Sequence, residues 1–326
     1  LKKNGLPVDA NRFDQYDCLE DAEDLSHLFD VLSSVSDKNG KSAIFTAYAL
    51  PANVDFEKMQ NENFAEYRYK LLTDTFSELP GYDGTWKVWK EGISAGLMCP
   101  EFHGREHLNI PLLMRLLAEK NNHLLTCITE RSLGALDASH VYALQYYAPF
   151  DFEEFSQNTF FKDVIRDGLN VFERVFGTRA KCFNAPGVPA HNSLEEELHN
   201  GGVRYIDSTF LKREHQGNRK FHYKLNYFGK RNTYGQSYLI RNCVFEPGLT
   251  PTNAVEQCLS EIEIAFMLKK PANISSHRVN FCGHINPKVR EQGLRQLKAL
   301  LQAITRKWQT VEFVTAREVG DMIESY

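Results

Sequence analysis

The sequence predicts an α/β protein with a parallel sheet covered by helices, and a closed or nearly closed (β/α) barrel is the favoured architecture. Short apolar runs typical of buried strands alternate with longer amphipathic segments typical of helices. About six main strands are visible in 326 residues, a length that suits one barrel. The glycine-rich phosphate motifs of nucleotide-binding folds, GxGxxG and GxxxxGK[ST], do not occur. An open parallel α/β sheet is the alternative.

The first residues predict the end of a helix. Lys2 and Lys3 would lie at its C-terminus, and Asn4-Gly5 would end it. The pattern predicts that a strand, a helix or a removed signal sequence lies upstream, and we expect the first βα unit of the fold to be missing or incomplete in this chain.

The later elements follow in alternation. Strands are expected at 43–49, 96–102, 180–185, 203–206, 238–242, 273–277 and 311–315. Helices are expected at 21–32, 64–79, 110–120, 152–176, 193–200, 251–270, 287–308 and 316–325, and residues 85–92 form a short amphipathic piece. We expect one domain over residues 1–326, with a polar, basic and aromatic excursion at about 208–236.

Composition excludes several classes of protein. The net charge is −4 and neither sign forms a long run, which argues against a nucleic-acid partner. No stretch approaches the roughly 20 apolar residues of a membrane span. The seven cysteines form no CxxC pair, and several lie in apolar runs, so a reducing compartment, the cytoplasm, is expected.

The motif His103-Gly104-Arg105-Glu106-His107 directly follows a predicted strand. Two histidines four apart on a helical turn have Cβ atoms about 6 Å apart, and they can share one metal ion through neutral imidazoles. A carboxylate would complete a two-His, one-acid site, with Glu101 and Glu106 as local candidates. Alternatively, the histidines are a chance pair, Glu106 favours a helix N-terminus and Glu101 pairs with Arg105.

Other ionisable residues follow predicted strands, where the catalytic groups of a parallel barrel lie. Asp207 follows the run at 203–206, and His277 and Arg278 follow 273–276. His277 could transfer a proton near neutral pH, or it could be a buried histidine satisfied by the backbone. Arg278 could bind an anion or pair with Asp207.

These features together resemble the polysaccharide deacetylase family, the NodB-type carbohydrate esterases with a deformed (β/α)7 barrel. The segment 103–107 matches the spacing of the family's His-Ser/Thr-x-x-His motif, with Gly104 in place of Ser/Thr. His277 stands where the family has a general acid, and Asn184 stands at the Arg of its Arg-x-Pro-Tyr segment. The Thr-Phe-Asp-Asp motif has no counterpart. The chain is similar to uncharacterised bacterial deacetylase-like proteins in which Asp-Asp-Trp-Gly precedes this region.

The resemblance implies a metal-dependent hydrolase that removes an acyl group from a carbohydrate by C–N or ester cleavage. A divalent ion, most readily zinc, would be held by two histidines of this chain and an upstream Asp, and would activate water. The candidate residues are then His277, Glu106 and Asp207 for catalysis, His103 and His107 for the metal, and Arg105, Arg278 and Asn184 for the substrate.

Two alternatives remain open. Glu101 and Glu106 could serve as the carboxylate pair of a glycoside hydrolase. The barrel could instead bind sugar without cleaving it, and Tyr227, Phe228 and Tyr234 would then offer stacking surfaces.

Overall fold

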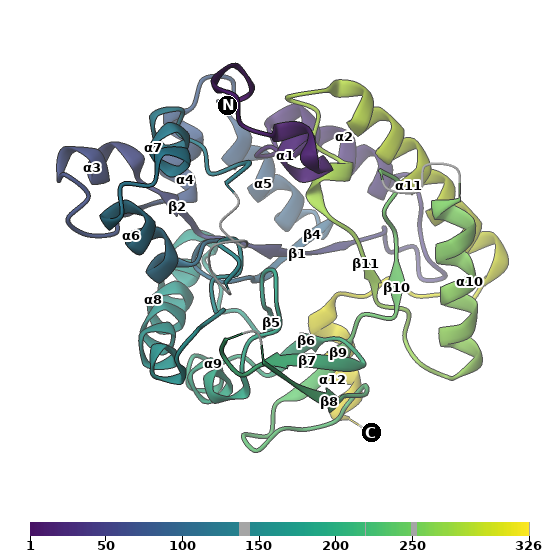
Figure 1. Ribbon diagram of the computed structural model, residues 1–326. Helices are drawn as coiled ribbons and strands as arrows, with labels where there is room; N and C mark the ends of the chain where they lie inside the picture. Colours follow the sequence, from purple (N-terminus) through teal and green to yellow (C-terminus); the bar gives the residue numbers. More distant parts are fainter. Residues whose placement is uncertain (137–143, 219, 249–252, 326) are drawn as a thin grey trace.

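A computed structural model describes residues 1–136, 144–218, 220–248 and 253–325, and its fold is mixed α/β. The centre is a five-stranded parallel sheet with strand order β1-β4-β5-β6-β9 (Figure 1). Its strands are β1 (Phe45–Ala49), β4 (Met98–Phe102), β5 (Cys182–Asn184), β6 (Tyr205–Ser208) and β9 (Ser237–Ile240). The predicted α/β class is confirmed.

Three further pairs of strands complete the β-structure of the described residues. One is parallel and begins three residues after the end of β9: β10 (Cys243–Val244) with β11 (Ile274–Ser275). The other two are antiparallel: β2 (Ala52–Val54) with β3 (Tyr69–Leu71), and β7 (Leu211–His215) with β8 (Phe221–Leu225). The last pair is a hairpin within the predicted excursion.

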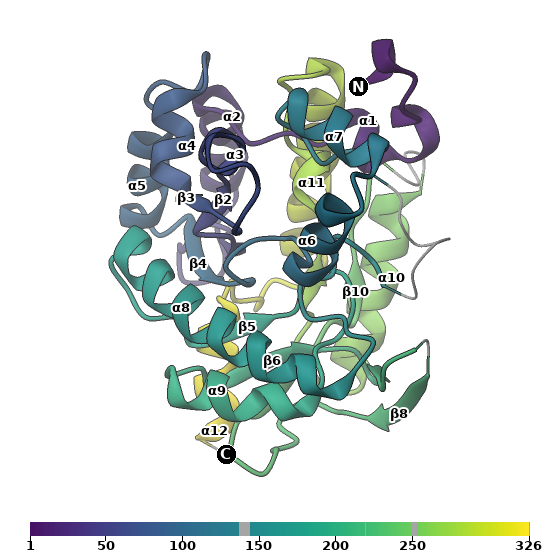
Figure 2. The ribbon, with the colours of Figure 1, turned by 60° about the vertical axis from the view of Figure 1, so that its left-hand side comes forward.

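The described residues contain twelve α-helices, and most lie outside the parallel strands (Figures 1 and 2). They are α1 (Arg12–Tyr16), α2 (Ala22–Ser33), α3 (Phe56–Asn61), α4 (Leu72–Glu78), α5 (Thr85–Ser94), α6 (Ile110–Ala118), α7 (Asn122–Thr129), α8 (Asn158–Phe176), α9 (Glu195–Asn200), α10 (Ala254–Met267), α11 (Pro287–Lys307) and α12 (Ala316–Glu324). Within the described ranges, no helix has the length and apolar character needed to cross a bilayer.

Side-chain caps determine several of these helix boundaries. Asp21 and Asp24 each accept a hydrogen bond from the other's backbone N–H at the start of α2. Asn109 caps α6 by accepting from the N–H of Leu112 at 3.0 Å. At the chain start, a 3-10 turn at Lys2–Asn4 ends at Gly5, which has a φ of 80°. The predicted terminal turn is therefore present.

The main core lies between the sheet and its outer helices. Phe102 of β4 is fully buried and contacts Phe172 of α8 and Phe183 of β5, with ring centroids 6.0 and 5.8 Å apart. A second apolar cluster joins the first residues of the chain to α6 and α7. The core therefore anchors β4 and β5, two of the strands that carry the candidate site.

Two predicted elements are wrong. Residues 64–79 contain β3 and α4 rather than one helix, because Asn63 and Phe64 take left-handed conformations with φ of 52° and 57°. Residues 311–315 form no strand. The N–H of Phe313 donates to the Asp37 carboxylate at 3.0 Å, so a side chain replaces the strand partner.

Candidate functional site

Polar side chains collect at the carboxyl ends of the parallel strands. His103 follows β4, Asn184 ends β5, and Asp207, its register partner, lies one residue before the end of β6. Since parallel strands end on one edge of the sheet, these residues from distant parts of the sequence become neighbours. The structure thus brings three of the predicted site residues together.

His103 and His107 lie together, with ring centroids 5.4 Å apart and planes at 70°. They are joined by bends rather than the expected helical turn, with Gly104 at a φ of 109°. Nδ1 of His103 lies 2.8 Å from the carbonyl oxygen of Asn184. Because a carbonyl only accepts, this nitrogen carries the hydrogen and Nε2 keeps a free lone pair.

Both imidazoles are held neutral. Burial, assisted by the neighbouring His107, lowers the pKa of His103 to about 3. His107 exposes part of its ring to solvent, but the protein around it still lowers its pKa by desolvation. Neutral imidazole is the form that binds a metal ion, so both rings are available as ligands at physiological pH.

Asp207 is the second notable group at this edge. Burial raises its pKa to about 6, although the guanidinium of Arg241, 3.4 Å away, acts in the opposite direction. Tyr48, from β1, points its buried hydroxyl toward this carboxylate. Oδ1 of Asp207 and Nε of Arg241 form an ion pair whose separation of 3.4 Å is longer than that of a direct hydrogen bond.

His277 forms a dyad with Glu246. Its Nδ1 lies 2.6 Å from the carboxylate, while the rest of the ring is exposed. Burial opposes ionisation of Glu246, but hydrogen bonds from His277 and Asn280 hold its pKa below the ordinary value. Arg12 also donates to Glu246. The ring of Phe13 also packs against His277, with ring centroids 5.3 Å apart.

Arg105 and Glu106 point into a separate cluster. The Arg105 guanidinium pairs with Glu106 and with Asp167 of α8, each at 2.7 Å. It also lies over the ring of Tyr69, 4.4 Å from the centroid. Glu106 has Tyr67 as its other neighbour. Arg105 therefore contacts β3 and α8, Glu106 contacts Arg105 and Tyr67, and neither side chain is paired with the two histidines.

Glu101 and Arg278 also have partners other than the expected ones. Glu101 is fully buried and pairs at 2.8 Å with Arg317 of α12, not with Arg105. Arg278 pairs with Asp17 at 3.0 Å and with Glu20 at 3.3 Å, and Arg241 takes the place beside Asp207. The suggested pairs of Glu101 with Arg105 and of Arg278 with Asp207 are wrong, because the fold places nearer partners beside each charge.

A small cavity of about 50 Å³ adjoins Asp207 and Arg241. It extends to Lys212 and His191 and has apolar walls that include Ala185. This volume admits ordered water or a small substituent of a ligand. The cavity therefore connects the strand-end site to the base of the β7–β8 hairpin.

Three residues of the site were missed by sequence reasoning. Tyr48 was visible as a polar-tipped residue in the apolar run 43–49, and Arg241 follows Ile240 at a strand end. Glu246 could not be recognised as a residue that follows a strand, because β10 has only two residues, too few to show an alternating apolar pattern.

Known proteins do not identify this chain: no family model matches it, and no curated protein matches it. Two of the ligands that a metal ion needs are present. His103 and His107 offer two nitrogen ligands, but in the described part of the chain no third His, Cys, Asp or Glu joins them in a cluster. The two imidazoles fit a metal as partial ligands, and the remaining ligands would have to come from elsewhere.

Proposed function

We propose that the strand-end site belongs to a hydrolase that removes an acyl group from a carbohydrate, as in the polysaccharide deacetylase family. The observation that carries this proposal is the pair of neutral imidazoles beside a buried carboxylate with a pKa of about 6. Completion of the parallel strands into a deformed (β/α)7 barrel is part of the proposal, and the single edge shared by the strand ends supports it.

His103 and His107 would hold a divalent ion together with further ligands from elsewhere. Zinc is the expected ion, because both ligands are imidazole nitrogens. When bound, such an ion polarises a carbonyl and acidifies water. The Asn184 carbonyl orients His103 for this purpose, because it fixes the hydrogen on Nδ1. Arg105 and Glu106 would then have a positioning role: their ion pair stabilises the segment that joins the two histidines.

Proton transfer would be shared between Asp207 and His277. Asp207 is ionised above pH 6 and can accept a proton from a nucleophilic water, with Arg241 beside it. His277, oriented by Glu246, would donate a proton to the departing amine or hydroxyl. Asn184 and Arg278 would contact the substrate. Seven free cysteines support the cytoplasm as the place where the protein works.

The test is to measure metal content and acetate release in the natural gene product and in His103→Ala. We expect about one divalent ion per wild-type chain and release of acetate from acetylated oligosaccharides, with both lost in the variant. His123→Ala removes an exposed histidine from α7 and serves as the matched control, with both readouts unchanged.

Unchanged metal content in His103→Ala would overturn the ligand assignment. A second function, carbohydrate binding without cleavage, is favoured by the missing third ligand among the described residues. Sugar binding by a wild-type protein with neither metal nor acetate release would establish that alternative. A glycoside hydrolase is disfavoured, because Glu101 and Glu106 are each held in separate ion pairs.

A further inference from the structure

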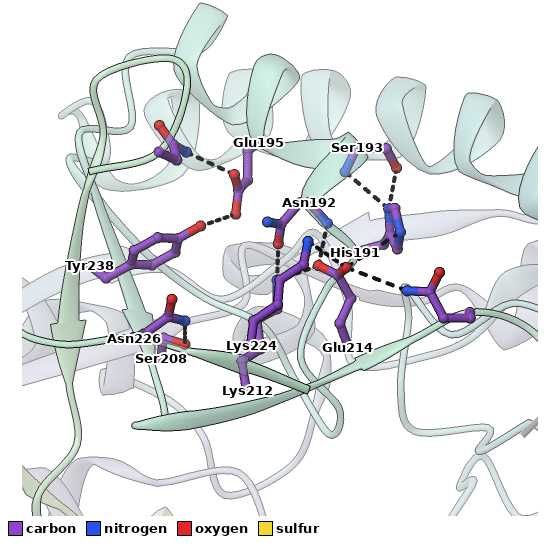
Figure 3. Close-up of polar contacts among 12 residues, drawn as sticks. His191, Asn192, Ser193, Glu195, Ser208, Lys212, Glu214, Lys224, Asn226 and Tyr238 are labelled. Atoms are coloured by element: carbon purple, nitrogen blue, oxygen red, sulfur yellow. Dashed lines mark hydrogen bonds and ion pairs between the residues drawn. The ribbon is translucent and has the colours of Figure 1, made fainter. Parts of the chain in front are cut away.

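The β7–β8 hairpin has its polar face inside and its apolar face outside. Lys212 and Glu214 of β7 and Lys224 of β8 project toward the loop before α9 (Figure 3). On the opposite face, Leu211 stands opposite Leu225, with exposed fractions of 50% and 60%. This is the reverse of the usual arrangement, in which the apolar face of a hairpin covers the core.

The inward ion cluster fixes this orientation. The carboxylate of Glu214 contacts Lys224 at 2.7 Å and Lys212 at 3.2 Å, and accepts from the N–H of Asn192 at 3.1 Å. Glu214 is almost fully buried, so a register slip or a flip would leave it without partners. The hairpin is therefore held with its apolar face toward solvent.

The exposed face is extended and aromatic. Tyr223 is 57% exposed, and Phe210 and Tyr227 at the base of the hairpin are 61% and 59% exposed. Several exposed apolar and aromatic side chains on one hairpin are typical of an interaction site. We define the hairpin platform as Phe210, Leu211, Arg213, Tyr223, Leu225 and Tyr227.

Charge indicates the chemistry of the partner. Residues 208–242 contain eight Lys or Arg and a single Glu, although the whole chain carries −4. The single Glu is Glu214, and its carboxylate is paired with Lys212 and Lys224 on the inward face. Lys220 and Arg231 are exposed, and among the described residues neither has a carboxylate partner. Arg213 lies over the Phe221 ring, 3.5 Å from the centroid. The partner should therefore be anionic.

We infer that the hairpin platform binds an acidic polysaccharide. Sugar rings would stack on Tyr223 and Tyr227, and their carboxylates would meet Arg213, Lys220 and Arg231. The base of the hairpin adjoins the strand-end site, because Thr209 and Lys212 line the small cavity that reaches Asp207. The choice of a sugar polymer rests on the proposed function, whereas the anionic and aromatic preference rests on the hairpin itself.

Isothermal titration calorimetry with polygalacturonate, its fully methyl-esterified form and poly(U) tests this inference. We expect wild-type affinity to be about tenfold higher for polygalacturonate than for either of the other two polymers, and to fall with added salt. Tyr223→Ala combined with Tyr227→Ala, and Lys220→Glu combined with Arg231→Glu, should each weaken binding about tenfold. Lys90→Glu, an exposed lysine on α5, is the control and should bind as wild type.

Equal or tighter binding to poly(U) would overturn the choice of a polysaccharide, and no binding to any polymer would overturn the inference. Dimerisation in analytical ultracentrifugation that disappears in the tyrosine variant would show that a second copy covers the platform, which also overturns it. His103→Ala should bind as wild type. Binding without acetate release would contradict the proposed function alone, and acetate release without binding would contradict this inference alone.

Discussion

Burial acts in opposite senses on two neighbouring side chains of the site. Loss of solvent disfavours charge, so it keeps His103 neutral with a pKa of about 3 and raises the pKa of Asp207 to about 6. The first effect makes an imidazole available as a ligand, and the second places a carboxylate near the pH at which a general base works best. Burial alone therefore gives both side chains the protonation behaviour that the proposed reaction needs.

The titration of Asp207 predicts a pH dependence. The ionised carboxylate accepts the proton, so the rate of acetate release should rise with pH and level off above about 6. Asp207→Asn should lower the plateau about 100-fold and remove this step. The Asp207→Asn variant should be at least as thermally stable as wild type at pH 7. Because the pKa of Asp207 is raised in the folded protein, ionising this carboxylate lowers the stability of wild type as the pH rises toward 6, and the amide does not ionise.

Asp163→Asn, which changes an exposed carboxylate on α8, is the matched control and should keep the wild-type profile. A wild-type rate that is flat from pH 5 to 8 would contradict the assignment of Asp207 as the base.

At the scale of elements, a glycine lets α11 approach the turn behind the dyad. A Cβ on Gly293 would lie 1.8 Å from the carbonyl oxygen of Asn280, a backbone atom in the 3-10 turn Arg278–Asn280. Asn280 donates to Glu246, which in turn orients His277. Close packing of one helix therefore supports a site residue on another element.

Gly293→Ala should force this turn away from α11. We expect a loss of about 1–3 kcal/mol in the free energy of unfolding, since the backbone clash exceeds the gain of up to about 1 kcal/mol in helix propensity. Urea denaturation measures the loss. Lys298→Ala, at an exposed position of the same helix, should change stability little. Equal stability of the two variants would show that the turn relaxes freely.

At the scale of the whole molecule, Glu101 connects distant parts of the chain. It lies on β4, accepts backbone N–H bonds from Lys181 and Cys182 at 2.8 Å, and pairs with Arg317 of α12. Burial raises its pKa, although Arg317 and the backbone donors oppose the shift. One buried carboxylate thus attaches the last helix to the middle of the parallel sheet.

Arg317→Ala should leave this carboxylate buried without its counter-charge. The expected loss is about 3 kcal/mol in the free energy of unfolding at pH 7, measured in urea. Glu101→Gln in the same background should recover part of it, because the neutral amide is less costly to bury. Arg295→Ala, an exposed residue of α11, is the control. A loss below about 1 kcal/mol for Arg317→Ala would mean that water reaches Glu101.

The sequence by itself determined the features that depend on near neighbours. Helices α11 and α12 end within a residue of prediction, and β4 lies inside the predicted run 96–102, because capping residues and apolar period are local signals. The contact of His103 with His107 is equally local, since four residues around Gly104 are enough to bring the rings together.

The tertiary structure alone decided the pairings between distant segments. It put Arg241 beside Asp207, joined Glu246 to His277, and turned the polar face of the hairpin inward. It also separated Arg105 and Glu106 from the histidines. These outcomes depend on which strand lies next to which and on how deeply each charge is buried. Both are properties of the packed chain that no short window of sequence contains.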